Sequence, residues 1–285
     1  MPPGSHNIRS RRQRRIFSTT ITPGGANVHW WGEVSVSLEQ KLSWQIGARA
    51  IVISRLEGEW VTWNLEAEQE NRSPVVMGDW HDPELLDIRK QSRNLQHGTT
   101  EHLSVLPALA DRSFVTRPAT PLKILPGERA RLYVSTPLWF QARTLKNDSL
   151  ILDVPFWRPS DSWFGSSTIS GEICYAKYTD ARLQLNALER APYRAITPIC
   201  VSNQHSEVLV IDRFNVPVPL LGLFSDESHH LWTEVVNIIR GEDDDAELEI
   251  SKEAPIEAGK SIRVSEPRVL SEKRTFIRRI SSLFL

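Results

Sequence analysis

The stretch from Asp153 to Ala181 limits the possible folds of this chain more than any other part of the sequence. An apolar run reaches Arg158, where Pro159 fixes one backbone dihedral and makes the chain turn. Gly165 can take a positive φ, and residues 169–178 then resume the composition of a strand. We therefore predict two strands joined by a stiff corner, which is either a lock in the core or a recognition surface. The candidate residues of this recognition corner are Trp157, Arg158, Asp161 and Trp163.

Alternating segments punctuated by proline continue along most of the chain. The sequence contains 18 prolines, 14 glycines and 10 tryptophans, which is typical of short strands and many corners. Residues 42–56 and 60–65 predict a hairpin, and residues 122–140 predict two strands around a Pro-Gly-Glu turn. The predicted fold class is all-β (mainly β), with two β-sandwich-like domains and a short C-terminal amphipathic helix. The predicted divisions are a disordered basic tail at 1–15, an N-terminal β domain at 16–105, a C-terminal β-sandwich domain at 106–270 and the amphipathic helix at 271–285.

Tryptophans are concentrated in the first of these domains. Cross-strand packing in a small sandwich or barrel explains them best, and a surface that stacks on a ligand is the alternative. The tryptophans in question are Trp30, Trp31, Trp44, Trp60 and Trp63.

Charge and cysteine content limit the partners and the compartment. The formal net charge is −1, so the molecule as a whole has no field that would attract nucleic acid, which makes nucleic acid an unlikely partner. Only the arginines between positions 9 and 15 could form a basic arm, and a solvated tail is the simpler interpretation. Cys174 and Cys200 lie in apolar strands, which favours buried reduced thiols over a bridge or a redox role. Because no secretory segment and no apolar run of membrane-spanning length occurs, we expect a cytoplasmic protein.

A polar segment between the two domains gathers imidazoles and carboxylates. Such side chains can form a metal site or a general acid and base pair, but their spacing matches no metal motif. A solvated connector is favoured, so we expect no metal and no cofactor, although metal binding by this cluster stays an open alternative. Residues 82–88 within it could form a short helix. The cluster consists of Asp79, His81, Asp82, His97, Glu101 and His102.

The last fourteen residues differ from the rest in their period. Apolar side chains recur at helical spacing, with basic side chains around them. Such a short helix is marginal alone, so it must dock, either on the protein's own sheet or on a membrane surface or partner. The predicted helix carries Phe276, Ile277, Arg278, Arg279, Ile280, Leu283 and Phe284.

Several motifs resemble those of one family. They are RPSDSWFG (158–165), GEICYA (171–176), YRAITP (193–198), NVPVPLLGLF (215–224), the LW pair at 231–232 and RRISSLF (278–284). Upstream, LPALADRSFVTRP (106–118) and LPGERARLYVSTPLW (125–139) look like the same family. The chain is similar, over roughly residues 28–285, to an uncharacterised prokaryotic family, domain of unknown function 432. This resemblance implies a β-rich cytoplasmic protein without an assigned activity, and it brings no catalytic residues.

No common catalytic motif occurs in the sequence. It lacks a GxxxxGK[ST] loop, a GxGxxG turn, a GxSxG elbow and a CxxC pair, which weakens nucleotide hydrolysis, dinucleotide redox chemistry and zinc ribbons. Enzymatic activity is uncertain and we favour its absence. The first hypothesis is therefore a non-enzymatic β-sandwich protein that binds a protein partner or forms a homo-oligomer. The corner at 157–163 and the basic C-terminal segment, through which peripheral membrane contact is also possible, are its candidate surfaces.

The alternative hypothesis is a carbohydrate-binding or glycoside-processing module. Exposed tryptophans of the corner at 157–164 could stack on sugars, and Asp161 with Glu172 could supply a carboxylate pair. This alternative requires an open groove with the two carboxyl groups on the same side. The burial of the corner residues distinguishes a core lock from a site.

Overall fold

The computed structural model describes residues 20–22, 29–80, 90–96, 98, 100–169, 171–177, 179–243, 245–279 and 283–284, with only the backbone described at 48 and 67–77. The predicted basic tail at 1–15 and the predicted short helix at 82–88 lie outside these residues.

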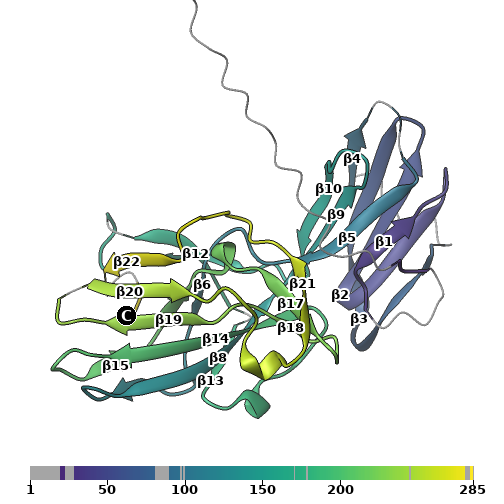
Figure 1. Cartoon of the computed structure of the whole chain (residues 1–285). Coiled ribbons are helices and arrows are strands. Elements are labelled where there is room, and N and C mark those ends of the chain that lie inside the picture. Colours follow the sequence, from purple (N-terminus) through teal and green to yellow (C-terminus); the bar gives the residue numbers. More distant parts are fainter. Residues whose placement is uncertain are drawn as a thin grey trace, which may run out of the picture.

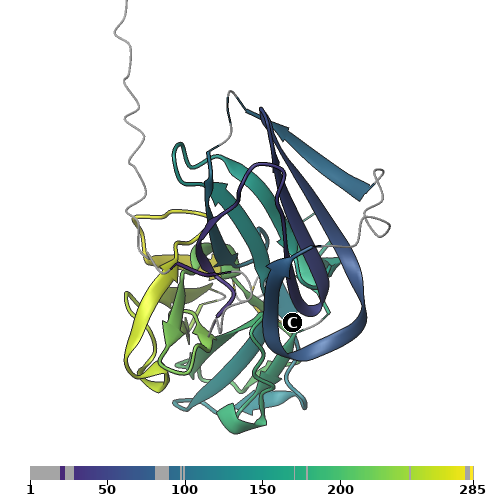
Figure 2. The same cartoon turned by 90° about the vertical axis from the view of Figure 1, so that its right-hand side faces the viewer.

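The described strands form two lobes, seen side by side in Figure 1 and from a perpendicular direction in Figure 2. The first lobe contains a four-stranded sheet and a three-stranded sheet. The four-stranded sheet has the order β1 (Gly32–Ser35), β5 (His102–Ala108), β9 (Trp139–Thr144) and β10 (Leu150–Pro155). The three-stranded sheet has the order β2 (Lys41–Leu56), β3 (Glu59–Asp79) and β4 (Gln91–Leu95).

The second lobe is built on a nine-stranded sheet, a four-stranded sheet and a two-stranded ribbon. The nine-stranded sheet runs β21 (Ser261–Ser265), β17 (Leu223–Asp226), β18 (Leu231–Trp232), β14 (Arg194–Asn203), β19 (Val236–Arg240), β20 (Asp245–Ile250) and β22 (Thr275–Arg279), with β8 (Arg129–Pro137) beside β14 and β13 (Asp180–Arg182) beside β8. The four-stranded sheet has the order β11 (Ser160–Phe164), β12 (Glu172–Ala176), β6 (Phe114–Thr116) and β16 (Phe214–Val216). The ribbon pairs β15 (Leu209–Ile211) with β7 (Leu122–Ile124).

The mainly β prediction is confirmed. Strand β20 illustrates the cause, because Ala246, Leu248 and Ile250 alternate with acidic residues and are each 2% exposed. Gly58 has a φ of 77° in the tight turn between β2 and β3, where the sequence predicted a hairpin. The helical elements among the described residues are the short 3-10 turns η2 (Leu185–Ala187), η3 (Val218–Leu220) and η4 (Ile256–Ala258). None of the described helices is long and apolar enough to cross a membrane.

One apolar cluster extends through both lobes. At its centre Trp30 stacks on Phe140, with 5.5 Å between ring centroids, and meets the edge of Phe156 at 5.0 Å. The five tryptophans for which core packing was predicted, Trp30, Trp31, Trp44, Trp60 and Trp63, are buried at 0–7% exposure, so that prediction is confirmed.

Contacts between the lobes come from distant parts of the sequence. The hairpin β9–β10 belongs to the range assigned to the second domain, yet β9 pairs with β5 in the first lobe. Arg268, which follows β21, donates to both carboxylate oxygens of Asp153 in β10 at 2.6 and 2.8 Å. Trp30 Nε1 donates to the carbonyl oxygen of Pro192 at 2.8 Å. Division of the chain into two separately folding domains therefore stays a prediction.

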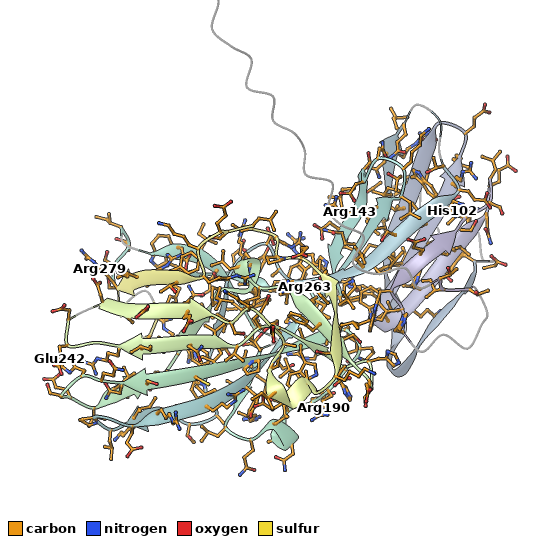
Figure 3. All side chains as sticks on the ribbon, viewed as in Figure 1. His102, Arg143, Arg190, Glu242, Arg263 and Arg279 are labelled. Atoms are coloured by element: carbon orange, nitrogen blue, oxygen red, sulfur yellow. The ribbon has the colours of Figure 1, made fainter. Side chains whose placement is uncertain are left out.

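The predicted C-terminal helix is wrong. Residues 275–279 form strand β22, which pairs antiparallel with β20. The register places Asp245 opposite Arg279 and Glu247 opposite Ile277, so one acidic side chain of β20 lies across from a basic side chain of β22. Figure 3 shows Glu242, in the loop that leads into β20, and Arg279 at the same end of the second lobe.

Leu283 and Phe284 nevertheless dock on the protein's own sheets, which was expected as the alternative to a membrane surface or a partner. Leu283 and Phe284 are 4% and 3% exposed. The backbone N–H of Asn215 donates to the carbonyl oxygen of Leu283 at 3.0 Å, and Phe284 forms an isolated bridge with Phe214 of β16. Ile280 lies outside the described residues.

Candidate functional site

The predicted corner leads into the hairpin β11–β12 at one side of the four-stranded sheet. The register places Trp163 opposite Ile173 and Asp161 opposite Tyr175. Because side chains alternate along a strand, these four project from the same face of the hairpin. We call this set, Asp161, Trp163, Ile173 and Tyr175, the hairpin face.

The hairpin face continues the inner side of the sheet. Tyr175 is the register partner of Phe114 in β6, which is fully buried, and the two rings are 5.6 Å apart. Along β12, Tyr175 is partly buried and Ile173 is 55% exposed, and Trp163 on the neighbouring strand β11 is 43% exposed. An apolar face thus begins in the core and runs out into solvent.

Charged groups surround this apolar face. Arg112 Nη1 lies 2.9 Å from Asp161 Oδ1, and its guanidinium group lies 5.4 Å from the centroid of the Tyr175 ring. The Tyr175 hydroxyl donates to Asp111 Oδ1 at 2.9 Å. Burial, together with this hydrogen bond to Asp111, raises the pKa of Tyr175 to about 12. The phenol is therefore a neutral donor at physiological pH.

The other two corner residues are separate from this face. Trp157 is partly buried and packs against the main core, and Arg158 is exposed. Asp161 pairs with Arg112 rather than with Arg158, a contact that spans 49 positions of sequence and that no local pattern could have predicted. Trp157 thus attaches the corner to the core, whereas Trp163 belongs to an exposed surface.

Two neighbouring features shape the hairpin. Trp163 Nε1 donates to the carbonyl oxygen of Ser167 at 2.8 Å, which fixes the ring against its own turn. A Cβ atom on Gly171 would lie 2.5 Å from the Phe164 carbonyl oxygen and 2.8 Å from the Trp163 ring. Glycine is therefore required where β12 begins.

The large apolar side chains on the opposite side of the hairpin are buried. Phe164 and Cys174 form a small buried cluster with Val115, and the Arg213 guanidinium lies 5.5 Å from the Phe164 ring centroid. Burial raises the pKa of Cys174 to about 12, with the charge of Glu172 as a further cause, so this thiol stays protonated. Cys200, like Cys174, is a free cysteine.

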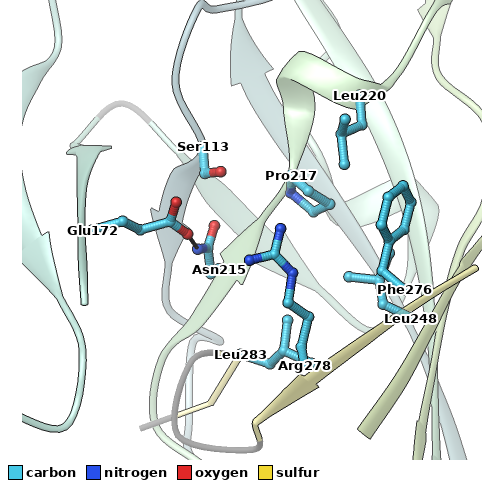
Figure 4. Close-up of a pocket in the computed structure, with 9 residues that line it drawn as sticks. All are labelled: Ser113, Glu172, Asn215, Pro217, Leu220, Leu248, Phe276, Arg278 and Leu283. Carbon is cyan, nitrogen blue, oxygen red and sulfur yellow. Dashed lines mark hydrogen bonds between the residues drawn. The ribbon is translucent and has the colours of Figure 1, made fainter. Parts of the chain in front are cut away.

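Glu172 projects to this opposite side. It accepts a hydrogen bond from Asn215 Nδ2 at 2.5 Å beside a small cavity between two sheets of the second lobe (Figure 4). The carboxylate pair that glycoside chemistry would need is therefore not formed, because Asp161 and Glu172 lie on different faces of the hairpin.

The cavity in Figure 4 is a poor ligand site because it is very small. Its volume is about 20 Å³, which is room for about one water molecule. Asn215 is 4% exposed, and its Oδ1 has no hydrogen-bond partner among the described residues. Arg278 reaches into the same space from β22. A single bridging water would satisfy these polar groups.

A larger depression, of about 540 Å³, lies beside the segment 249–256. Its charged lining is mixed, since Arg131, Lys252 and Arg274 face Glu249 and Glu253. The two carboxylates oppose the binding of an anion, and the three basic side chains oppose the binding of a cation.

The candidate metal cluster is not assembled in the part of the chain that the structure describes. Asp79 accepts a hydrogen bond from Gln40 at 2.7 Å, Glu101 accepts one from Ser35 at 2.6 Å, and His102 begins β5. No group of three or more potential ligands among the described residues could hold a metal ion. The remaining members, His81, Asp82 and His97, lie outside those residues.

Fold and site together define the class: a mainly β protein of two lobes, with an apolar hairpin face that is not covered by the described residues. The sequence matches the family model described as protein of unknown function (DUF432) over residues 30–284, so the chain belongs to that family. The family suggested by the motifs at 158–165 and 171–176 is thereby confirmed. No curated protein and no solved structure matches the chain.

Proposed function

We propose that this protein is a non-enzymatic binding protein that takes a protein partner, or a second copy of itself, on the hairpin face. The observation that carries the proposal is that the apolar face which packs on the core at Phe114 and Tyr175 continues into solvent, where no described residue covers it. Trp163 and Ile173 together expose large apolar side chains at the centre, and Arg112 with Asp161 supplies a polar rim. Protein interfaces commonly have this arrangement, and tryptophan and arginine are frequent energetic centres within them.

The contact should be with a macromolecule rather than a small ligand. The residues of the hairpin face line neither of the two cavities described above, whereas small-molecule sites are concave and mostly enclosed. The pairing of Asp245 with Arg279 also favours a protein partner over an anionic membrane, because a negative charge lies opposite a basic side chain of the last strand. We further propose that the protein acts in the cytoplasm, where its free thiols would stay reduced.

Site-specific photo-crosslinking in cells that produce the full chain tests this function. A benzophenone amino acid at position 173 should yield a reproducible covalent adduct with one defined protein, identified by mass spectrometry. The same group at Ile256, which is 95% exposed on a different surface, is the matched control. Absence of an adduct at position 173, or the same adducts at both positions, would refute the proposal.

Carbohydrate binding is a second candidate, supported only by the exposed ring of Trp163. It would be recognition without hydrolysis, because Asp161 and Glu172 do not face one site. A glycan array probed with the full chain and with Trp163→Ala should then show one class of sugar that only the unchanged chain retains. An array without specific signals would remove this candidate.

A further inference from the structure

Strand β11 offers a sheet edge beside the hairpin face. Among the described strands it pairs only with β12, so it is the last strand of its sheet. Its residues from Ser160 to Trp163 are exposed or partly exposed, and the Asp161 side chain is 68% exposed. The outer backbone N–H and C=O groups of such a strand are available to another strand.

A charged side chain often protects an edge strand from pairing with another chain, and this protection is weak at β11. A lone carboxylate on an edge strand disfavours pairing, because its partner strand would bury it. Asp161 is neutralised by Arg112 at 2.9 Å. The edge strand, which is 5 residues long, therefore carries no uncompensated charge.

The charges on and beside the face are balanced. Arg112 pairs with Asp161, Asp111 accepts a hydrogen bond from Tyr175, and Arg158, which is not part of the face, is exposed two residues before β11 begins. Together these groups contribute two positive and two negative charges. A strongly acidic or strongly basic partner gains nothing from such a patch, whereas an identical patch turned by a two-fold rotation can place opposite charges together. The formal net charge of −1 also leaves little long-range repulsion between two copies.

Resting on the proposed function, we infer that the partner is a second copy of this chain. The two β11 strands pair antiparallel, each four-stranded sheet continues into the other, and the two hairpin faces form one apolar surface. Trp163 of each copy then lies near the two-fold axis, where a large ring contributes most to an interface. An isologous contact of this kind closes after two copies and does not lead to fibres.

Sedimentation of the full chain over concentrations from about 1 to about 500 μM tests the inference. We expect a monomer and dimer equilibrium, with the dissociation constant raised at least about tenfold by Trp163→Ser. Arg158→Glu changes the balanced patch to a net charge of −2 per copy, so it should weaken the dimer at low salt and less at high salt. Ile256→Ser is the control and should leave the equilibrium unchanged. Thermal unfolding of each variant shows whether its fold is kept.

The outcomes separate this inference from the proposed function. A chain that stays monomeric at all concentrations, while position 173 crosslinks to a different protein, overturns the inference and leaves the proposed function standing. A monomer without any adduct overturns both. A dimer unaffected by Trp163→Ser and Arg158→Glu places the interface elsewhere and also overturns the inference.

Discussion

Replacing Arg268 with alanine should destabilise the whole chain, because this side chain joins the two lobes. Its Nη1 and Nη2 atoms donate to the two carboxylate oxygens of Asp153 at 2.6 and 2.8 Å, and its Nε donates to the carbonyl of Leu109. The two charged side chains are 18% and 22% exposed. The pair is therefore mostly withdrawn from water, and its geometry is bidentate.

The expected magnitude follows from these contacts. Removing one partner of a buried ion pair costs about 3–5 kcal/mol, because the other charge stays desolvated. Since both side chains still touch water, we expect the lower end, about 3 kcal/mol for Arg268→Ala. Asp153→Ala alone should lower the free energy of unfolding by a similar amount. In a chain that already carries Arg268→Ala, the same substitution should lower it by at most about 1 kcal/mol further.

Urea unfolding followed by tryptophan fluorescence measures these free energies, since Trp30 and Trp44 lie in the shared core. Arg182→Ala is the control, because Arg182 contacts Asp180 at 3.1 Å in a pair whose side chains are 37% and 36% exposed, and such pairs contribute at most about 1 kcal/mol. Additive effects of the Asp153 and Arg268 substitutions would refute the reasoning. Two separate unfolding transitions in the unchanged chain would instead support two independently folding domains.

Three further predictions concern single side chains. Burial, and to a lesser extent the neighbouring His229, lower the pKa of His29 from its ordinary value of 6.5. The folded chain therefore favours neutral His29, and the stability that this provides is present above pH 6.5 and is lost as the pH falls below that value. His229→Asn, which suits the φ of 62° at that position, should flatten this loss in thermal unfolding between about pH 7.5 and about pH 5. Gly47→Ala should lower the free energy of unfolding by about 2 kcal/mol, because its φ is 58° and the new Cβ would lie 3.0 Å from the Tyr193 ring. Cys174 should resist iodoacetamide at about pH 8 in the folded chain and react after unfolding in urea, as followed by mass spectrometry.

Each of these predictions has a discriminating control. Gly127→Ala shares the positive φ of 76° but meets no atom within 4 Å, so it should cost less than the change at Gly47, and an equal cost would mean that the ring contact contributes nothing. An unchanged pH profile in His229→Asn would show that the histidine pair does not influence acid stability. Rapid labelling of Cys174 in the folded chain would contradict its burial.

Local patterns predict many of the strands and the core. Alternation predicts β2 and residues 60–65 of β3, glycine predicts their turn, and the density of large rings predicts burial, because each of these signals lies within about twenty residues of sequence. The polar residues over which β3 continues to Asp79, and β4 within the predicted polar connector, carry no such signal. The pairing of β9 with β5 has no such signal. The register runs from Leu103 opposite Thr144 to Ala108 opposite Trp139, and either strand could equally have paired with a nearer one.

The C-terminal error has a specific physical cause. Phe276, Ile280, Leu283 and Phe284 satisfy a helical period, but only when the whole segment is taken as one element. In the structure Phe276 belongs to a strand whose partner, β20, supplies an apolar neighbour for it at Leu248 and an acidic neighbour for Arg279 at Asp245. A short helix is marginal without such partners, so the segment is more stable as a strand on an existing sheet.

The recognition corner shows where sequence reasoning ends and what the structure adds. Trp157 and Trp163 are six positions apart with similar surroundings in sequence, yet one packs on the core and the other is 43% exposed. The difference arises from sheet position, because Trp163 lies on the edge strand β11, beyond the last strand that the core covers. An apolar ring in that place costs solubility and contributes little to the fold, so selection for folding alone does not account for it. Replacing it should therefore leave thermal stability almost unchanged and act on association instead, which is the behaviour expected of an interface residue and not of a core residue.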